Sequence, residues 1–481
     1  MNVPPTDITN ASNSQIKRID QEILDHEDAI RELRSRRNLL MPVSRLPVEV
    51  LCAIFMCVPD KSRYYRWHWI TVTHTCRLFR TIALNCPALW STPDFTKPKL
   101  AYEMIKRSKM APLTIQVIPE YPLTPRVVDA VSVGLKQLPR INKIHLLASG
   151  DNMYKLLSGV HDPAPFLRTL ILDSIHTRVE SYVLRPDFLG GDAPQLTHVD
   201  LSSCHLSWDS CFLRNLIYLR MHYPGPPVPT LGQFIIALTG MPQLQVLDLD
   251  CALPDSTYTR TDEKSYVDLP CLRKLYIAGT LSECAIFITH VYIPPSATVH
   301  IKAICEQPEK DSVTPGLINQ VCRWLTVSRD TTKTTIRSDA GIPLIKGLLV
   351  EMSKFELVIE AWGSESIANP TTMCHPASTH RSATNSGSLK LELNWSRTVT
   401  SQLYNELVVA VCSLLPLRQL RNLLVKNEYP VDSLTFVKAF GLLPNVHTVT
   451  IVSDSAKEVI EALNPAPTVP ISTDSSSATL P

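Results

Sequence analysis

The sequence predicts an α/β solenoid preceded by a helical arm and a small helical module. Three observations support this prediction: a heptad pattern near the start of the chain, two short apolar-periodic segments after it, and a recurring apolar string in the remainder. With 481 residues, the chain is long enough for each part to have its own core. The predicted divisions are a disordered segment 1–11, a heptad helix 12–41, a helical module 42–95, a repeat domain 96–463 and a disordered tail 464–481.

Composition argues against several classes of function. The formal net charge is only +2, so no global field attracts nucleic acid or anionic membrane. The 13 cysteines are scattered without a C-x-x-C pair, as expected of reduced thiols inside the cell. No apolar run reaches the ~18 residues of a membrane span, and the first ten residues lack the apolar core of a signal peptide. We therefore expect an intracellular protein, cytoplasmic or nuclear or both.

The heptad pattern predicts a helical arm. Ser12 and Gln15 have the spacing of a capping box, which would begin the helix. Two interpretations remain open: a short coiled coil that makes a weak homodimer through residues 14–41, or an arm packed on its own chain. The a and d positions are Ile16, Ile19, Ile23, His26, Ile30, Leu33, Arg37 and Leu40.

The two apolar-periodic segments predict a compact module of three short helices. In the first, apolar residues recur at steps of three and four, as on one face of a helix. Pro47 suits the first helical position, Glu49 suits the positive end of the helix dipole, and Pro59 would end the helix. The apolar positions of the second are Ile70, Val72, Cys76, Phe79, Ile82 and Ala83, followed by Pro87 and the pair Leu89-Trp90.

This module resembles the F-box, whose order of Leu-Pro, Glu, Ile-Phe, Pro, Val, Cys-Arg, aromatic residue and Leu-Trp it follows. It departs from the pattern at Phe79, where Trp is usual, and at Thr75, where Val is usual. The resemblance implies docking to the adaptor subunit of a cullin-RING (SCF-type) ubiquitin ligase, while the rest of the chain selects the substrate. The adaptor-binding residues that it implies are Leu46, Pro47, Glu49, Leu51, Ile54, Phe55, Val58, Pro59, Cys76, Phe79, Leu89 and Trp90.

The third observation is the string P-x-L-x-x-L-x-L, in which Ile or Val can replace Leu. It occurs at 139–146, 165–172, 194–201, 242–249, 270–277 and 444–451, with weaker copies at 215–221 and 418–425. From Ile144 to Leu275 its central residues are 26, 29, 20, 28 and 28 residues apart. This is the period of leucine-rich repeats, in which each repeat contributes one short strand and one helix.

The repeat is irregular in its second half. Alternating apolar residues at 299–301, 355–359 and 389–393 predict further strands, and the polar stretch 361–388 predicts a mobile insertion. A heptad arm, an F-box and irregular leucine-rich-like repeats in this order are similar to F-box proteins of mushroom-forming fungi (basidiomycetes).

No catalytic motif stands out. Phosphate-binding, dinucleotide-binding, zinc-protease and nucleophile-elbow patterns are absent from the sequence, so we expect no enzyme activity, no cofactor and no metal. Asp248 and Asp250 share one face of a predicted strand, as in a D-x-D metal pair, but repeat strands usually place such residues in solvent.

Strand alternation also predicts a substrate-binding wall. If the Leu and Val positions of the repeat face the core, the polar residues between them lie on the concave surface, where an excess of Asp should make the local field negative. The alternative is that they are merely solvated strand residues. The predicted substrate-binding residues are His145, Asp173, His198, Asp200, Tyr218, Arg220, Asp248, Asp250 and Tyr276; His222 and Lys274 lie on the same wall.

Two functions follow from these predictions. The first is a substrate-recognition adaptor of a ubiquitin ligase, bound to the ligase adaptor and cullin scaffold through the F-box. The alternative is a non-catalytic scaffold or regulatory interaction protein with a degenerate F-box.

Overall fold

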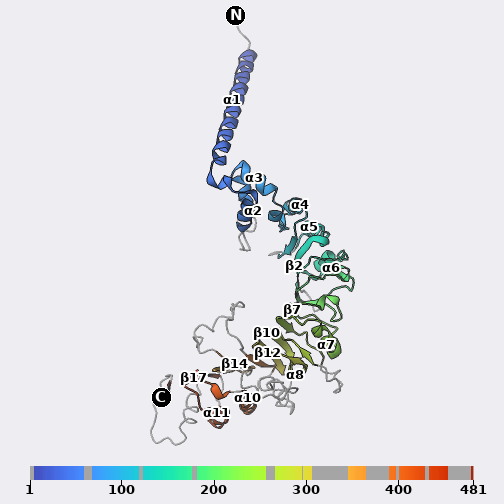
Figure 1. The fold of residues 1–481 in the computed structure, drawn as a ribbon, viewed down its shortest axis with the longest axis vertical. Helices are drawn as coiled ribbons and strands as arrows, with labels where there is room; N and C mark the ends of the chain where they lie inside the picture. Colours follow the sequence, from blue (N-terminus) through green and yellow to red (C-terminus); the bar gives the residue numbers. More distant parts are fainter. Residues whose placement is uncertain are drawn as a thin grey trace. The chain divides into compact units, whose positions relative to one another are not determined.

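A computed structural model of the chain shows a helical N-terminal region followed by an α/β region with a large sheet (Figure 1). The chain divides into two compact units, one comprising Met1–Val117 and Leu123–Lys143 and the other Ile118–Pro122 and Ile144–Pro481. The described residues are 5–58, 68–118, 123–175, 181–255, 266–294, 296–305, 345–363, 389–396, 400–415, 417–427, 433–441, 443–452 and 478–479.

The first unit opens with α1 (Pro5–Leu39), a helix of 35 residues. It begins at Pro5 rather than at Ser12, which corrects both the predicted start and the disorder predicted for residues 5–11. Proline is tolerated in a first turn because the N–H that it lacks would have no intrahelical acceptor there.

The apolar heptad positions of α1 are exposed. Ile23 and Ile30 are 50% and 48% exposed, and Leu33 is 63% exposed. One ion pair joins the helix to the next part of the unit, from Arg77 to Glu32 at 3.0 Å. Within the described residues, the arm is therefore not packed on its own chain, in contrast to one of the two interpretations.

The helical module follows α1 directly. Its elements are η1 (Pro42–Arg45), α2 (Val48–Cys57), η2 (His68–His74), α3 (Arg77–Leu84) and η3 (Pro87–Trp90). Pro47 was predicted to be the first helical residue of α2, but it is the N-cap of that helix. Glu49 does lie in the first turn of α2, where a carboxylate suits the helix dipole. Pro59, the predicted stop, lies outside the described residues.

Aromatic side chains fill the core of the module. Trp69 and Trp90 meet edge to face with ring centroids 4.8 Å apart, and Phe55 meets Phe79 in the same way at 5.0 Å. The indole N–H of Trp90 donates to the carbonyl of Ala83 at 2.9 Å, which satisfies its buried polar atom. The core also contains Leu51, Val72, Ile82, Cys86 and Leu89.

A buried arginine stabilises the end of the first unit, which contains α4 (Pro98–Arg107), β1 (Leu113–Val117), α5 (Pro125–Leu135) and η4 (Leu138–Arg140). Arg140 is 7% exposed, and its guanidinium donates to the Ser108 hydroxyl and to the carbonyls of Ala111 and Ile105 at 2.9, 3.0 and 3.2 Å. Two of these acceptors lie at the C-terminal end of α4, where helix carbonyls lack partners and a cation is favoured.

The second unit is built on parallel strands that alternate with helices and loops. The first three residues of β2 (Ile141–Ser149) belong to the first unit and the rest of that strand to the second. The first half of the second unit continues with α6 (Gly150–Leu157), β3 (Thr169–Ile175), β4 (Tyr182–Val183), η5 (Phe188–Gly191), β5 (His198–Ser202), β6 (Cys204–His205), η6 (Cys211–Leu213), β7 (Tyr218–His222), α7 (Leu231–Thr239), β8 (Val246–Asp250), β9 (Val267–Asp268), β10 (Lys274–Thr280), α8 (Leu281–His290), β11 (Val291–Tyr292) and β12 (Thr298–Cys305). The short strands β4 and β6 pair with each other, as do β9 and β11.

The predicted repeat strands are adjacent and in register. Leu170 of β3 pairs with Val199, which in turn pairs with Leu219. The same row continues through Leu247 to Leu275, and all five residues are at most 2% exposed. The central residues of these five predicted repeats thus occupy equivalent positions in the sheet.

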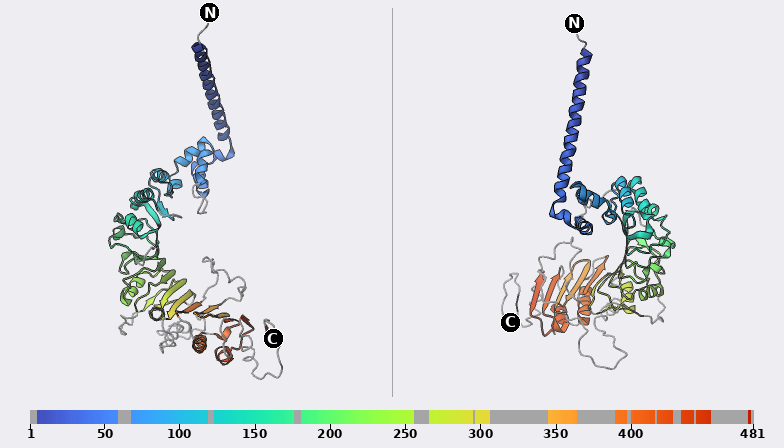
Figure 2. Two further views of the ribbon diagram at one scale, coloured as in Figure 1. Left: turned by 180° about the vertical axis from the view of Figure 1, so that it is seen from behind. Right: turned by 45° about the horizontal axis from the view of Figure 1, so that its top comes forward.

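Helices cover the side of the sheet that carries these apolar residues. Figures 1 and 2 show α6, α7 and α8 on one side of the strands. Both α7 and α8 begin with capping boxes, Thr230 with Gln233 and Thr280 with Glu283, which satisfy the first helical N–H groups. Among the described residues, no helix combines the length and apolarity needed to cross a membrane.

The strands after β12 depart from the chain order of a simple repeat. They are β13 (Gly347–Met352), β14 (Glu356–Trp362), β15 (Leu389–Trp395), β16 (Asn422–Asn427), β17 (Thr448–Val452) and β18 (Ala478–Thr479), with α10 (Ser401–Leu414), η9 (Leu417–Gln419) and α11 (Ser433–Phe440) between them. The spatial order is β12-β15-β14-β13-β16-β17-β18, and β14 is antiparallel to both of its neighbours.

The short connection between β13 and β14 accounts for this reversal. Only residues 353–355 separate the two strands, and the Ser353 N–H donates to the Glu356 carbonyl at 2.9 Å. A connection this short can join antiparallel strands, whereas a parallel pair needs a crossover of a dozen or more residues. The expected strands at 355–359 and 389–393 therefore exist, but they do not stack in chain order.

Two predicted disordered segments fall largely outside the described residues. Ala361 and Trp362, the first residues of the predicted insertion 361–388, belong to β14, and residues 364–388 are not described. In the predicted tail 464–481, residues 478–479 form β18 against β17, which corrects the prediction there because the edge of β17 offers unpaired backbone groups.

Candidate functional site

The second unit presents a polar face on its sheet, opposite the apolar row. Along β5, β7 and β8, every second residue is buried, and the residues between them are half-buried. All predicted wall residues lie at these intermediate or exposed positions, because strand side chains alternate between the two faces. We call this surface the polar face. Its residues are His145, Asp173, His198, Asp200, Tyr218, Arg220, His222, Asp248, Asp250, Lys274 and Tyr276, together with His300 and Lys302 of β12 and Lys390 and Glu392 of β15.

The centre of the polar face is a cluster of charges around Arg220. Register places Asp200 and Asp248 on either side of it, and its guanidinium lies 3.7 Å from the first carboxylate and 3.6 Å from the second. His222 approaches Asp248 more closely, with Nε2 2.6 Å from Oδ1. The four side chains form a half-buried network in which each charge has a partner, so their mutual positions are constrained.

Aromatic rings extend this network along the sheet. The imidazole of His198 stacks on the Tyr218 ring with centroids 3.9 Å apart and an interplanar angle of 11°. Further along, Tyr276 meets His300 edge to face at 4.8 Å. Rings held in this way offer large, rigid surfaces at little cost in conformational entropy, as protein-binding sites often do.

Four further residues of the polar face were missed by the sequence prediction: His300 and Lys302 on β12, and Lys390 and Glu392 on β15. The Glu392 carboxylate lies 3.1 Å from His300 Nε2 and 2.5 Å from Lys390 Nζ. Polar and apolar residues alternate in T-V-H-I-K (298–302) and in L-K-L-E-L (389–393), and this pattern could have identified these four residues from the sequence. They give the face a basic segment beside the acidic one.

Burial shifts several pKa values on the polar face. Burial raises the pKa of Asp200, against the opposing effects of Arg220 and His222. Burial, aided by the charges of Asp200 and Asp248, raises the pKa of Tyr218 to about 12. For Glu392, burial acts upward, but its contacts with His300 and Lys390 prevail and lower its pKa to about 2. The face therefore keeps a fixed Glu392 charge and neutral tyrosines at neutral pH.

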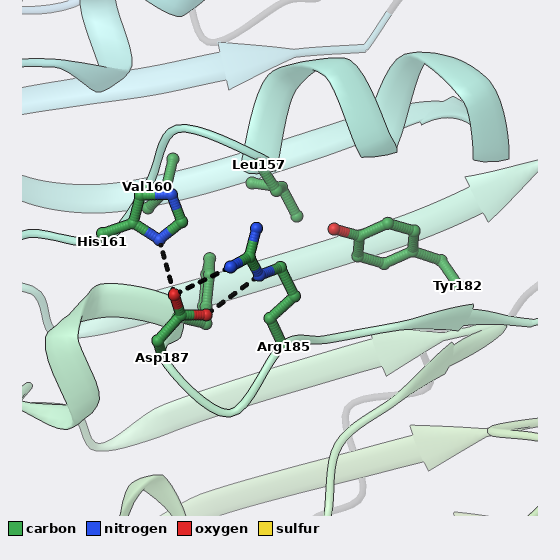
Figure 3. A pocket seen from close by; sticks show the side chains of 7 residues that line it. Leu157, Val160, His161, Tyr182, Arg185 and Asp187 are labelled. Atoms are coloured by element: carbon green, nitrogen blue, oxygen red, sulfur yellow. Dashed lines mark hydrogen bonds and ion pairs between the residues drawn. The ribbon is translucent and has the colours of Figure 1, made fainter.

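A small hollow lies beside β4 and η5. Asp187 binds the Arg185 guanidinium through two 3.0 Å hydrogen bonds, and its Oδ2 lies 3.1 Å from His161 Nδ1 (Figure 3). The hollow contains about 160 Å³ of empty space, including open solvent at its mouth, which is less than typical ligand sites contain. Its polar groups already satisfy one another, so it is not a candidate binding site.

No metal-binding cluster is evident in the described part of the chain, where no three His, Cys, Asp or Glu side chains are grouped to hold an ion. Asp250, the second residue of the D-x-D pair, follows Asp248 on the same face of β8, with Leu249 buried between them. Asp248 itself is engaged by His222 and Arg220.

The first unit presents a second candidate surface on α2. The predicted adaptor-binding residues that the structure describes are buried, partly buried or exposed. Leu51, Phe55, Leu89 and Trp90 are at most 6% exposed and form the module's own core, whereas Cys76 and Phe79 are partly buried. Leu46, Pro47, Glu49, Ile54 and Val58 are exposed, and Val48, Val50 and Met56 add to the apolar surface beside them.

This exposed apolar surface is unusual for a short helix. Ile54 is 43% exposed and Val50 is 42% exposed, although α2 already buries Leu51 and Phe55 on its adjacent face. Contiguous apolar side chains on a surface mark sites of protein interaction more often than isolated ones do.

Comparison with known families assigns the helical module. Residues 43–96 match the F-box-like family model, so this part of the chain is an F-box-like domain. The match nearly coincides with the predicted module 42–95 and supports the resemblance to F-box proteins. Comparison with curated proteins gave no match. An F-box-like domain implies binding to the adaptor subunit of SCF complexes, and with it a role in substrate recognition by a ubiquitin ligase.

Proposed function

We propose that this chain is the substrate-recognition subunit of an SCF-type ubiquitin ligase, in which the F-box-like domain docks to the adaptor and the polar face binds a protein substrate. The F-box-like match over residues 43–96 carries the proposal. In this role the chain makes and breaks no bond itself. It acts inside the cell, in the cytoplasm, the nucleus or both, and needs no cofactor.

The exposed side of α2 supports the docking step. Leu46, Val50 and Ile54 form an apolar surface that the module's own core leaves uncovered. Burying such residues against an adaptor would remove apolar area from water, which is the main driving force of association. The buried residues Leu51, Phe55 and Trp90 would support this surface by fixing the positions of the helices.

The polar face supports the substrate step. The in-register parallel strands with helices on one side are what a leucine-rich-repeat-like solenoid would have, and such folds bind ligands on their sheet. Asp173, Asp200, Asp248 and Asp250 outnumber Arg220 at its centre, so a substrate segment with basic or amide groups would fit there. The ring stack of His198 and Tyr218 would provide an aromatic anchor.

The alternative is a non-catalytic scaffold that no longer enters a ligase. The departures at Thr75 and Phe79 favour it, since a weaker second half of the domain would bind an adaptor less tightly. In the structure, however, Phe79 packs on Phe55, so the smaller aromatic residue does occupy a place against the core.

Affinity purification of the full chain from cells of its own source, followed by mass spectrometry, separates the two functions. Recovery of adaptor and cullin together would support the ligase subunit. Recovery of other partners without adaptor or cullin, from cells in which both are abundant, would support the scaffold.

A further inference from the structure

The helix α1 has an uncovered apolar stripe that the proposed ligase function does not use. Its apolar heptad positions are exposed, from Ile16 at 55% to Leu33 at 63%, and so is the last heptad residue, Leu40, which directly follows the helix and is 71% exposed. Six of the eight positions are Ile or Leu. A long solvated helix gains little stability from its own hydrogen bonds, so a stripe of this kind is stabilised chiefly by packing against a partner.

The charges of α1 are unequally distributed along its length. Asp20, Glu22 and Glu27 lie in the half that begins with Ile16, whereas Arg34, Arg36 and Arg37 lie near the end of the helix. With Ile16 at position a, five of these residues occupy the e and g positions that flank an interface, and Arg37 occupies an a position within the seam.

A parallel pair of these helices would bring like groups together. Each Arg37 would face the same arginine of the second copy in the seam, and each His26 would face its counterpart. On the flanks, Glu22 would meet Glu27 of the second copy. Like charges at such positions are destabilising, so the sequence disfavours this arrangement.

An antiparallel pair reverses these relationships. Ile16 lies opposite Leu40, Ile19 opposite Arg37, Ile23 opposite Leu33, and His26 opposite Ile30 of the second copy. The arginine and the histidine are thereby separated from their counterparts by apolar neighbours, along which the long arginine side chain can extend toward water.

The flanking charges are also complementary in this arrangement. Asp20 meets Arg34 of the second copy, and Glu22 meets Arg36, each twice by symmetry. Only Glu27 faces its own counterpart, and the central g position is the neutral Ala29. Antiparallel helices also align their dipoles favourably.

We infer that the chain forms an antiparallel homodimer through α1, with Ile23 of each copy packed on Leu33 of the other. This symmetry makes the interface isologous and therefore closed, as in most dimers. The two F-box-like domains would then lie at opposite ends of a helix pair about 50 Å long, estimated from the rise per residue.

A charge exchange between Asp20 and Arg34 tests the arrangement. Neither side chain makes an ion pair within the described part of the helix, so each substitution changes the interface more than the helix itself. In a parallel pair, Asp20 and Arg34 would face the neutral residues Gln15 and Ala29, and their exchange would have little effect. The full chain is studied by sedimentation equilibrium at micromolar concentration and about 50 mM salt, where surface charges are weakly screened.

We expect the parent chain to dimerise, and Asp20→Arg or Arg34→Asp alone to raise the dimer Kd about tenfold, since two attractive contacts become repulsive. An equimolar mixture of the two variants, or the double variant, should restore the parent Kd. If the mixture regains the parent Kd, both single variants must be folded, because each contributes one helix to the dimer. Ile23→Asp should abolish the dimer.

Three results would overturn the inference. The parent could sediment as a monomer throughout, the single variants could dimerise as well as the parent, or neither the mixture nor the double variant could restore dimerisation. Circular dichroism at 222 nm, which should be unchanged in each variant, controls for loss of the helix.

Discussion

The imidazole of His222 lies 2.6 Å from the carboxylate of Asp248, on the neighbouring parallel strand of the polar face. The Nε atom of Arg220 lies 3.6 Å from the other oxygen of this carboxylate. The pair fixes the position of an acidic group that a binding partner could use, because both side chains are half-buried and neither is free to turn away.

Replacing both Asp200 and Asp248 with Lys should weaken binding of a basic substrate segment by about tenfold or more. The change removes two negative charges and adds two positive ones where steering and pairing would occur. Binding is measured by calorimetry with the partner recovered from affinity purification. Asp151→Lys with Asp192→Lys makes the same charge change at exposed sites away from the face and should leave binding unaltered. Equal effects of the two double variants would contradict a specific role of the face.

The substitution Ile54→Asp should abolish capture of the ligase adaptor while the F-box-like domain stays folded. Ile54 is exposed on α2, so a carboxylate there is solvated in the free chain but would be desolvated in the complex. Co-precipitation measures the binding. Met110→Asp, at a site 81% exposed in the same unit, is the matched control. Undiminished capture by Ile54→Asp would count against docking through this side of α2.

The substitution Glu392→Gln should destabilise the second unit at neutral pH by about 2–3 kcal/mol. The folded-state pKa of Glu392 is lowered from 4.5 to about 2, so the charged form stabilises the fold above pH 4.5. That contribution is lost as the pH falls from 4.5 toward 2. Urea denaturation of parent and variant should thus show a gap that narrows below about pH 4.5. A gap that is constant with pH would show that Glu392 acts through packing alone.

The substitution Arg140→Ala should destabilise the first unit by about 2–3 kcal/mol, because it removes the guanidinium donor to the Ala111 carbonyl and to the Ser108 hydroxyl and one of the two donors to the Ile105 carbonyl. Arg140→Lys should recover only part of this loss, since one ammonium cannot reach three acceptors as a planar guanidinium does. Thermal denaturation measures the effect, and Arg126→Ala on the exposed side of α5 should change little. Equal midpoints for the two alanine variants would exclude the structural role.

Local pattern sufficed to predict most strands and the alternation of their faces. The row from Leu170 through Val199, Leu219 and Leu247 to Leu275 was identifiable because a strand has a side-chain period of two and each repeat presents the same phase of it. The same phase placed Asp200, Tyr218 and Asp248 on one surface. The start of α1 was predicted less accurately, since a helix can continue through polar residues that form no apolar stripe.

Sequence patterns alone were therefore sufficient for most of the strands, the F-box-like module, the heptad stripe and the face on which the polar residues lie. Contacts between residues far apart in the chain became known only from the three-dimensional fold. The insertion of β15 beside β12, the contact of Glu392 with His300 and the burial of Arg140 against α4 all join segments far apart in the chain. Alternation and helical periodicity are set by neighbouring residues, whereas these contacts depend on how the elements pack in three dimensions.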